Sequence, residues 1–162
     1  MIKVRRAAYV TLIVLAGFLA LTTFAGGIGL AAGISTPPVS YLNGSIFQNY
    51  TVPGLCLFLL GSGSAILATI LLARKSQFAL LSATVAAIVI MFFEFVEVLV
   101  IGSPEGVAQA LQIFYFGLGT LISVIVAGIW FIDLWSREHS FEINKTNNRA
   151  SQRKLSKSQK PA

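Results

Sequence analysis

The sequence predicts an all-α membrane protein, a four-transmembrane-helix antiparallel bundle whose N and C termini are both cytoplasmic. Three observations predict this fold. The 162 residues are 56% hydrophobic and only 11% charged, whereas a soluble domain carries about 25% charge. Four charge-poor stretches are each long enough to cross a hydrocarbon core of about 30 Å as a helix. The basic residues lie outside these stretches, on one side of the predicted membrane.

The composition also excludes several classes of protein. An ordinary soluble enzyme needs a polar surface that so few charged residues do not provide. A disordered chain would be less hydrophobic, and a disulfide-rich chain would need more than the single cysteine, Cys56. The strands of a membrane β-barrel would alternate apolar and polar residues over segments of about ten positions, and these stretches do not alternate.

The four predicted spans follow one another in order, and each is a nearly continuous apolar run of about 20 residues or more. The connections 74–77 and 102–106 are too short for anything except a reversal between adjacent helices, and Pro104 suits the first turn of the fourth helix. A longer outer loop, residues 33–51, joins the first two spans. The spans cover residues 7–32, 52–73, 78–101 and 107–135.

The distribution of basic residues orients the predicted bundle. Cytoplasmic loops of membrane proteins are enriched in Lys and Arg. All 12 Lys and Arg residues lie before the first span, between the second and third spans, or after the fourth, and the two loops on the opposite side contain none. This split places both termini in the cytoplasm and concentrates the net charge of +6 on one membrane face.

The N-terminal segment has a second interpretation. Basic residues followed by an apolar run also resemble a secretory signal peptide, with Thr23-Phe24-Ala25 as its cleavage site. The apolar run of about 25 residues exceeds the roughly 7–15 residues of a signal peptide's hydrophobic region. The length therefore favours a first span that is retained.

The final segment, residues 136–162, differs in composition from the rest. It holds seven basic residues against two glutamates, which predicts a disordered basic cytoplasmic tail. Basic residues near a membrane surface are attracted to anionic headgroups by about 1 kcal/mol each. We therefore expect the lipid bilayer and its anionic headgroups as partners, and no nucleic acid, because only Phe141 is available to stack on bases.

Two glutamates interrupt the third span and are the first candidates for chemistry. An ionisable residue at mid-membrane costs about 2.5–3.5 kcal/mol, so such residues are rare and face the bundle interior. The spacing of Glu94 and Glu97 puts both carboxyl groups on one helical face, which also carries Ala83 and Ala87. From the helical rise, they lie about 10 Å and about 6 Å below the outer boundary.

Other polar residues are expected at a similar depth, and the chain supplies no internal counter-charge because no Lys, Arg or His lies within these spans. Three interpretations stay open. The glutamates form a protonated pair whose hydrogen bonds join helices, or a site for a proton, a cation or a cationic ligand, or water reaches Glu97 from outside. The candidate intramembrane polar cluster consists of Glu94, Glu97, Gln109, Gln112, Tyr115, Thr22 and Thr23.

Small residues recur at helical spacing in three spans and predict close helix packing. The run Gly61-Ser62-Gly63-Ser64 lacks the lysine of a phosphate-binding loop, so we interpret it as packing as well. The candidates for helix packing are Ala25, Gly29, Gly61, Ala65, Gly119 and Ser123.

The spans lack the residues that catalytic sites combine. The only histidine, His139, lies in the tail, and Cys56 has no second thiol. A serine nucleophile would need a base beside it, which the spans do not offer. We therefore expect no catalytic residue, no metal site, no cofactor and no enzymatic activity.

The outer loop is uncharged and aromatic, and it carries a resemblance to a known family. Its Tyr41, Phe47 and Tyr50 suit the headgroup layer, so anchoring at the interface is the preferred role, and covering the polar cluster is the alternative. The segment 42–55, LNGSIFQNYTVPGL, resembles the LxGSPFxDYTIPGL segment of small, uncharacterised four-helix membrane proteins of bacteria. The stretches 97–102 and 111–119 are similar as well, whereas Ile46 and Asn49 replace the Pro and Asp of the pattern. The resemblance implies the four-helix topology and no particular activity.

Two functional hypotheses follow for a multi-pass protein of the cell membrane. The first is a non-enzymatic accessory or assembly subunit, which forms a homo-oligomer or binds another membrane subunit through its small-residue faces. The second is binding or transport of a proton, a cation or a cationic ligand through Glu94 and Glu97.

Overall fold

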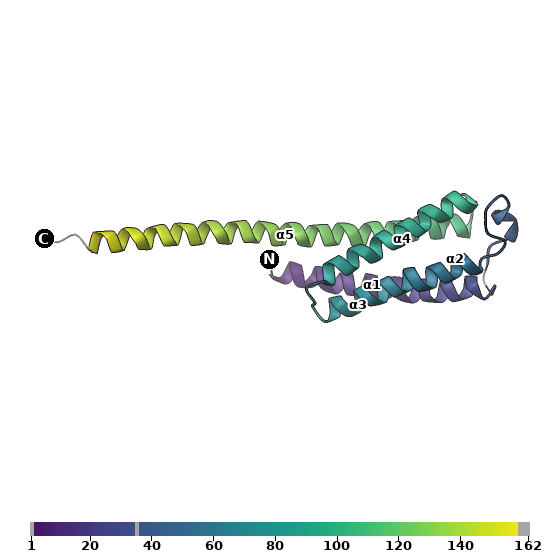
Figure 1. Ribbon diagram of the computed structural model, residues 1–162, viewed down its shortest axis with the longest axis horizontal. Helices are drawn as coiled ribbons and strands as arrows, with labels where there is room; N and C mark the ends of the chain where they lie inside the picture. Colours follow the sequence, from purple (N-terminus) through teal and green to yellow (C-terminus); the bar gives the residue numbers. More distant parts are fainter. Residues whose placement is uncertain (1, 35, 159–162) are drawn as a thin grey trace. The chain divides into compact units, whose positions relative to one another are not determined.

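The computed structural model describes residues 2–34 and 36–158, with side chains for residues 4–34 and 36–135. Within this part of the chain the elements are helices and turns, and no strand occurs (Figure 1). They confirm the predicted all-helical fold with four segments able to span a membrane, and their ends differ by only a few residues from the predicted ones. Those segments are Val4–Ala31, Thr51–Ala73, Ala79–Ile101 and Val107–Trp135.

The first span belongs to helix α1 (Ile2–Ala31). The helix ends where Gly33 adopts a left-handed conformation (φ 71°), and the Ile34 amide donates a hydrogen bond of 3.0 Å to the Gly29 carbonyl. Such a bond satisfies a carbonyl that the end of a helix leaves free. Buried positions recur every three or four residues, as expected for a helix with one face in a bundle. They include Leu12, Ala16, Leu19, Thr23 and Gly27.

The second span is one continuous helix with a wide turn in its middle. It begins as α2 (Thr51–Cys56), passes through the π-helical turn η2 (Leu57–Ser62) and continues as α3 (Gly63–Ala73). The sequence predicted a regular helix here. A π-helical turn is a rare local widening of an α-helix, and the apolar pattern of this span does not reveal it.

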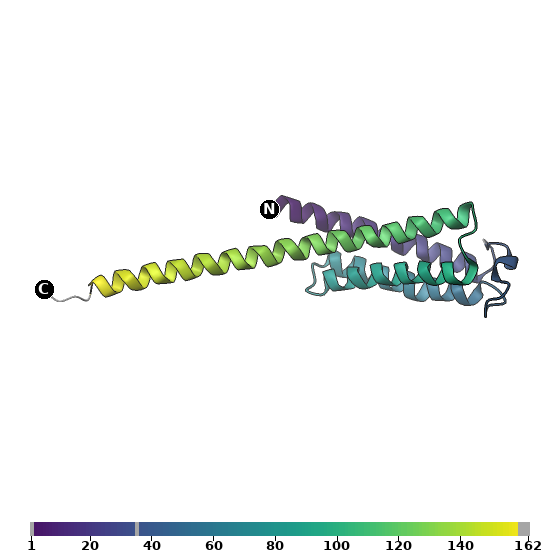
Figure 2. The ribbon, with the colours of Figure 1, turned by 90° about the horizontal axis from the view of Figure 1, so that it is seen from above.

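Glycines bring α1 and the second span into backbone contact. A Cβ atom on Gly27 would lie 2.7 Å from the backbone nitrogen of Phe58. A Cβ atom on Gly54 would overlap the backbone nitrogen of Ala31. Because a side chain at either position would collide with backbone, only glycine fits there. The helices α1 and α3 accordingly lie side by side (Figures 1 and 2).

The predicted packing residues lie inside the bundle, with one exception. Ala25 is exposed, because it lies about 200° around the helix from the buried Thr23. Gly27 takes the inward position instead, since a four-residue spacing of small residues does not distinguish two overlapping faces of one helix. The other candidates are buried (Gly61, Ala65, Gly119) or half-buried (Gly29, Ser123).

A tight turn, in which Lys75 adopts a left-handed conformation (φ 51°), leads into α4 (Ala79–Ile101). One face of α4 buries small residues, including Ala83 and Ala87, and the opposite face exposes Phe92 and Leu99. This division is the predicted one. Small side chains let α4 approach α3 closely, which is how helices associate in a membrane.

The fourth span opens helix α5 (Val107–Ser158), of which the part up to Val126 belongs to the bundle, while a second unit begins at Ala127. Residues 136–158, for which the sequence predicts a disordered tail, continue this helix. Helix propagation adds one hydrogen bond for each residue that it fixes, and no Gly or Pro interrupts residues 129–158. The side chains of residues 136–158, and with them the predicted headgroup contacts, lie outside the described residues.

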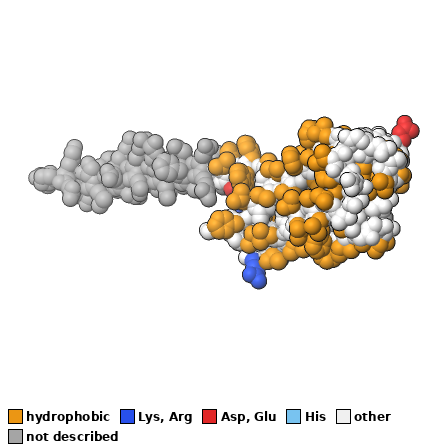
Figure 3. Space-filling view, turned by 45° about the vertical axis from the view of Figure 1, so that its right-hand side comes forward, with side chains coloured by type: hydrophobic (Ala, Val, Ile, Leu, Met, Phe, Trp, Pro, Cys, Tyr) orange, Lys and Arg blue, Asp and Glu red, His pale blue; other side chains and the backbone are white. Residues whose placement is uncertain are grey.

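The surface along the spans is apolar. Figure 3 shows hydrophobic side chains distributed along the described helices, with the visible charged side chains near the ends. Large side chains such as Leu21 (74%), Leu99 (70%) and Phe92 (65%) are mostly exposed. A soluble protein does not expose apolar area on this scale, whereas acyl chains cover it without penalty. The chain is therefore a multi-pass membrane protein.

Candidate functional site

Helix α4 carries Glu94 and Glu97 in its last two turns. Three residues turn a helix by about 300°, so the two side chains start within about 60° of each other, on the face that holds Ala83 and Ala87. Glu94 is buried, with 5% of its surface exposed, and Glu97 is half-buried. The sequence predicted this inward orientation for both glutamates.

Gln112 joins Glu97 to the turn between α4 and α5. Its Nε2 donates to Glu97 Oε1 at 3.2 Å and to the backbone carbonyl of Gly102 at 3.1 Å. Its Oε1 accepts a hydrogen bond of 3.0 Å from the Ser103 hydroxyl. With both amide hydrogens and its oxygen in use, the buried Gln112 side chain is fully satisfied. It therefore holds Glu97 in one position.

The neighbouring Glu94 carboxyl is arranged differently. It interacts electrostatically with Glu97, yet no described residue donates a hydrogen bond to it. Among the described residues, no buried side-chain oxygen or nitrogen lacks a hydrogen-bond partner. The Glu94 oxygens therefore still touch accessible space, although 95% of the residue's surface is covered.

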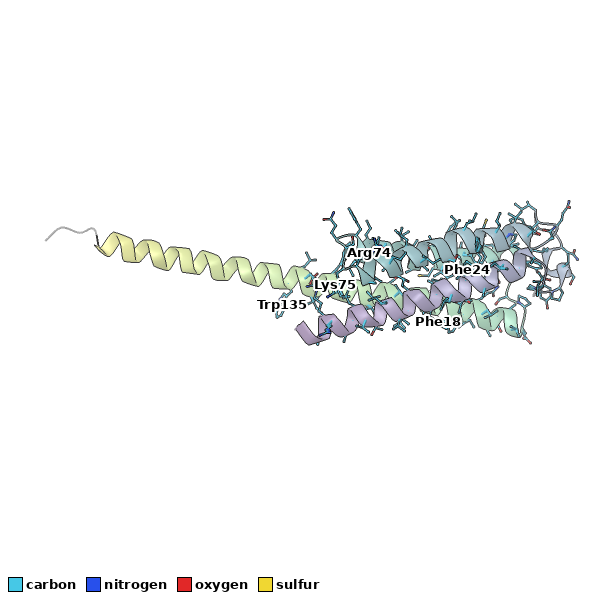
Figure 4. The ribbon with its side chains drawn as sticks, turned by 90° about the horizontal axis from the view of Figure 1, so that it is seen from below. Phe18, Phe24, Arg74, Lys75 and Trp135 are labelled. Carbon is cyan, nitrogen blue, oxygen red and sulfur yellow. The ribbon has the colours of Figure 1, made fainter. Side chains whose placement is uncertain are left out.

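Among the side chains that the structure describes, no cationic group pairs with the two glutamates. The sequence contains no Lys, Arg or His between residues 7 and 73 or between 76 and 135. Arg74 and Lys75 lie at the end of the bundle away from the outer loop (Figure 4). A buried carboxylate without a counter-charge is unfavourable, so this end of the bundle favours a bound proton or cation.

The outer loop folds against the same end of α4. It contains the short helix η1 (Val39–Leu42), which contacts α4 (Figure 1). Leu42 and Tyr50 are buried, with 3% and 5% of their surfaces exposed. The Tyr50 hydroxyl donates a hydrogen bond of 3.2 Å to the Pro38 carbonyl. The loop is thus anchored by two buried side chains, Leu42 and Tyr50.

The pKa of Tyr50 is affected by its burial and by the charge of Glu97. Burial, then the negative charge of Glu97 and then that of Tyr41, raise the pKa of the Tyr50 hydroxyl above its ordinary value. An effect of Glu97 on this hydroxyl agrees with the contact between η1 and α4. Covering of the polar residues, the alternative role of the loop, is therefore compatible with the position of η1 on α4.

The remaining members of the predicted cluster bond elsewhere. The Thr22 hydroxyl donates to the Phe18 carbonyl at 2.9 Å, and the Thr23 hydroxyl donates to the Leu19 carbonyl at 2.7 Å, both on their own helix. Tyr115 is half-buried beside the Phe114 ring, and Gln109 is half-buried with no hydrogen bond to a described side chain. Of the seven candidates, Glu97 and Gln112 share a hydrogen bond, and Glu94 joins them through its charge.

Three contributors to this site were not among the predicted site residues. Ser103 and Gly102 stand next to the predicted span end, and a serine two residues after a helix that carries two glutamates is a local pattern that could have indicated a hydrogen bond. Tyr50 is separated from Glu97 by most of two spans, so only the folded chain lets the charge of Glu97 act on its hydroxyl.

The site offers carboxyl, amide, hydroxyl and carbonyl oxygens and one unneutralised acidic pair. Such groups bind protons and hard cations. Among the described residues, no three His, Cys, Asp or Glu side chains gather as metal ligands. No protein-family model, no curated protein and no solved structure matches this chain.

Proposed function

We propose that this protein binds a proton at Glu94 and Glu97 in the outer half of the membrane. Binding of a small cation at the same site is the alternative. In this proposal the four spans form an antiparallel bundle in the cell membrane with both termini in the cytoplasm. The support for this orientation is the restriction of every Lys and Arg to one side of the spans. The role is binding or transport, and it involves no enzymatic step.

A single observation carries the proposal: Glu94 is 5% exposed and accepts no hydrogen bond from a described residue. An ionised carboxylate in that position would lack both a hydrogen-bond donor among the described residues and a counter-charge. Selection rarely retains such a residue without a functional reason, because a buried acid in a membrane is costly. A proton removes the charge and requires no additional space.

The two glutamates take unequal parts in the proposed site. Glu97 is fixed by the Gln112 amide, so its carboxylate is stabilised by a hydrogen bond as well as by its partial exposure. Glu94 has no such support and is the proton-binding group. The titratable groups at this end of the bundle are Glu97 and Tyr50, whose pKa is raised in part by the charge of Glu97, while Cys56 is exposed at the outer part of its span and Tyr115 is half-buried on α5.

The test uses the protein reconstituted in lipid vesicles and a lipid-soluble carbodiimide, which reacts with protonated carboxyl groups inside membranes. Mass spectrometry should find Glu94 modified near neutral pH, with a rate that falls as the pH rises. Glu94→Gln should abolish the modification, and Glu105→Gln, which changes an exposed glutamate in the turn before α5, should leave it unchanged. A Glu94 that never reacts, or reacts at the same rate at every pH, would contradict proton binding.

The same experiment separates a proton from a cation. If a small cation occupies the site, Na⁺ or K⁺ added at constant pH should protect Glu94 from the reagent in a concentration-dependent manner. Impermeant choline as the replacement salt controls for ionic strength. Protection by one cation and not by choline would assign the site to that cation.

A second candidate, an accessory or assembly subunit, is favoured by two exposed glycines. Cβ atoms on Gly63 of the second span and on Gly117 of α5 would meet nothing within 4 Å. Small residues on a lipid-facing surface allow a partner helix to approach, either from a second copy or from another membrane subunit. Gly63→Leu and Gly117→Leu should then reduce the oligomer size measured in detergent, and an unchanged size would remove this candidate.

A further inference from the structure

The outer loop is buried at two points and is mostly exposed elsewhere. Leu42 in η1 and Tyr50 before α2 are buried, while Ile46 between them is 90% exposed. The helix η1 contacts α4, the helix that carries both glutamates. A loop with this pattern is anchored at its base and exposed at its tip. Such loops open locally at a lower free energy than the core of a protein does.

Tyr50 connects this loop to the carboxyl pair. Its hydroxyl donates to the Pro38 carbonyl, 12 residues earlier, at 3.2 Å, which closes the loop on itself. The segment that this bond closes includes η1, which contacts α4, and the charge of Glu97 contributes to the raised pKa of the Tyr50 hydroxyl. The residue that closes the loop therefore holds the segment that contacts the helix of the site.

We propose that residues 36–50 form a movable cover over the outer end of the Glu94–Glu97 site and that Tyr50 is its latch. The described conformation is the closed one, in which Leu42 and Tyr50 are buried and η1 contacts α4. Breaking the Tyr50–Pro38 hydrogen bond opens the cover and increases the access of water to the half-buried Glu97 and then to Glu94. This inference rests on the proposed proton binding only for its physiological meaning.

The latch is weak enough to be reversible. A neutral hydrogen bond of this kind shifts an equilibrium by about two- to tenfold. The burial of Leu42 and of the Tyr50 ring adds to the stability of the closed state. Removing only the hydroxyl should therefore increase the open fraction by about two- to tenfold while the ring still packs.

The test compares Tyr50→Phe with Tyr41→Phe in the full chain reconstituted in lipid vesicles. The reagent is a water-soluble carbodiimide added outside, and the readout is the rate of modification at Glu97, divided by the rate at the exposed Glu105. Tyr50→Phe should raise this ratio by about two- to tenfold. Tyr41→Phe removes a hydroxyl from a more exposed tyrosine of the same loop and should leave the ratio unchanged.

A second variant tests whether opening of the loop, and not a folding defect, explains the result. Leu42→Ala removes the other buried contact of the loop and leaves Tyr50 in place, so it should raise the same ratio. The elution volume of each variant in detergent reports whether it keeps the native assembly. If both variants elute like the original protein and neither changes the ratio, the cover does not exist.

The two proposals fail separately. If the lipid-soluble reagent modifies Glu94 in a pH-dependent manner and Tyr50→Phe does not change the water-soluble rate, proton binding stands and the cover is refuted. If Tyr50→Phe raises the water-soluble rate and the lipid-soluble reagent never modifies Glu94, the cover is supported and proton binding is refuted.

Discussion

Two contacts between helices in this bundle are built in opposite ways. Where α1 meets the second span, the backbones touch at Gly27 and Gly54, and the polar side chains are satisfied within their own helices. The Thr23 hydroxyl donates to the Leu19 carbonyl. This contact is held by shape alone, as expected for helices that lack a hydrophobic driving force in lipid.

Where α4 meets α5 at its outer end, side-chain hydrogen bonds cross from one element to another. Gln112 bonds to Glu97 on α4 and to Gly102 and Ser103 in the turn. Deeper along the same contact, a Cβ atom on Gly119 would lie 2.6 Å from Met91 Cγ, so close packing returns away from the outer end. The polar contact is confined to the part of the helix pair that holds the glutamates.

The difference between these two contacts indicates which buried groups helix packing explains and which it does not. Shape associates α1 with the second span without any buried charge, so helix association does not by itself require the buried Glu94 carboxyl. Buried polar groups that are dispensable for assembly are expected at functional sites. The following variants test this division by measuring thermal unfolding in detergent micelles.

The largest effect is expected at the shape-dependent contact. Gly54→Ala places a methyl group against the backbone of Ala31, which does not yield as a flexible side chain would, and should lower the free energy of unfolding by about 3 kcal/mol. Gly63→Ala is the matched control, because a Cβ atom there meets nothing within 4 Å. It should be neutral or stabilising by up to about 1 kcal/mol. Equal melting temperatures for the two variants would disprove the backbone contact.

The next effect concerns the polar contact. Gln112→Leu removes three hydrogen bonds and leaves the Glu97 carboxyl and the Gly102 carbonyl without their donor, so we expect a loss of about 2 kcal/mol. Gln109→Leu changes the same residue type one turn earlier, where the amide has no hydrogen bond to a described side chain. It should change stability by less than about 0.5 kcal/mol. If Gln109→Leu were as damaging as Gln112→Leu, the network would not be what joins these helices.

Substitutions of the two glutamates should change the stability of the protein in opposite directions. Glu94→Met replaces an unpartnered buried carboxyl with an apolar side chain of similar size and should stabilise the protein by about 1 kcal/mol. Glu97→Met removes the acceptor of the Gln112 amide and should destabilise it by about 1 kcal/mol. Destabilisation by both would mean that Glu94 supports the fold, and its proposed functional role would lose its basis.

The smallest effect is a pH dependence at Tyr50. Because its pKa is raised in the folded protein, the neutral hydroxyl stabilises the folded loop. This contribution is complete below the ordinary tyrosine pKa of about 10 and is lost as the pH rises through the higher folded value. Ultraviolet titration should show one tyrosine that ionises above the ordinary value of about 10 and disappears in Tyr50→Phe. If the tyrosine lost in Tyr50→Phe is instead one that ionises near pH 10, the raised pKa of the buried hydroxyl is contradicted.

Local patterns in the sequence account for much of this molecule. Four apolar runs predicted the spans to within a few residues, and the three-residue spacing of Glu94 and Glu97 predicted one inward face. Both inferences need only the helical period and the length that a membrane requires. Ala25 shows the boundary of such reasoning, since small residues on two overlapping faces of α1 are equivalent until a partner helix selects one.

By itself, the sequence determined that the chain enters a membrane, which segments cross it and which face of the third span is polar, because hydrophobicity and helical period are properties of each segment alone. Only the tertiary structure decided that Glu97 is bonded and Glu94 is not, that Gly54 and Gly27 rather than Ala25 mark the backbone contact, and that Tyr50 is buried at the base of a loop whose helix η1 contacts α4. These features depend on the rotation and register of one helix against another. The uniformly apolar surfaces of the spans leave that register unspecified until the helices pack.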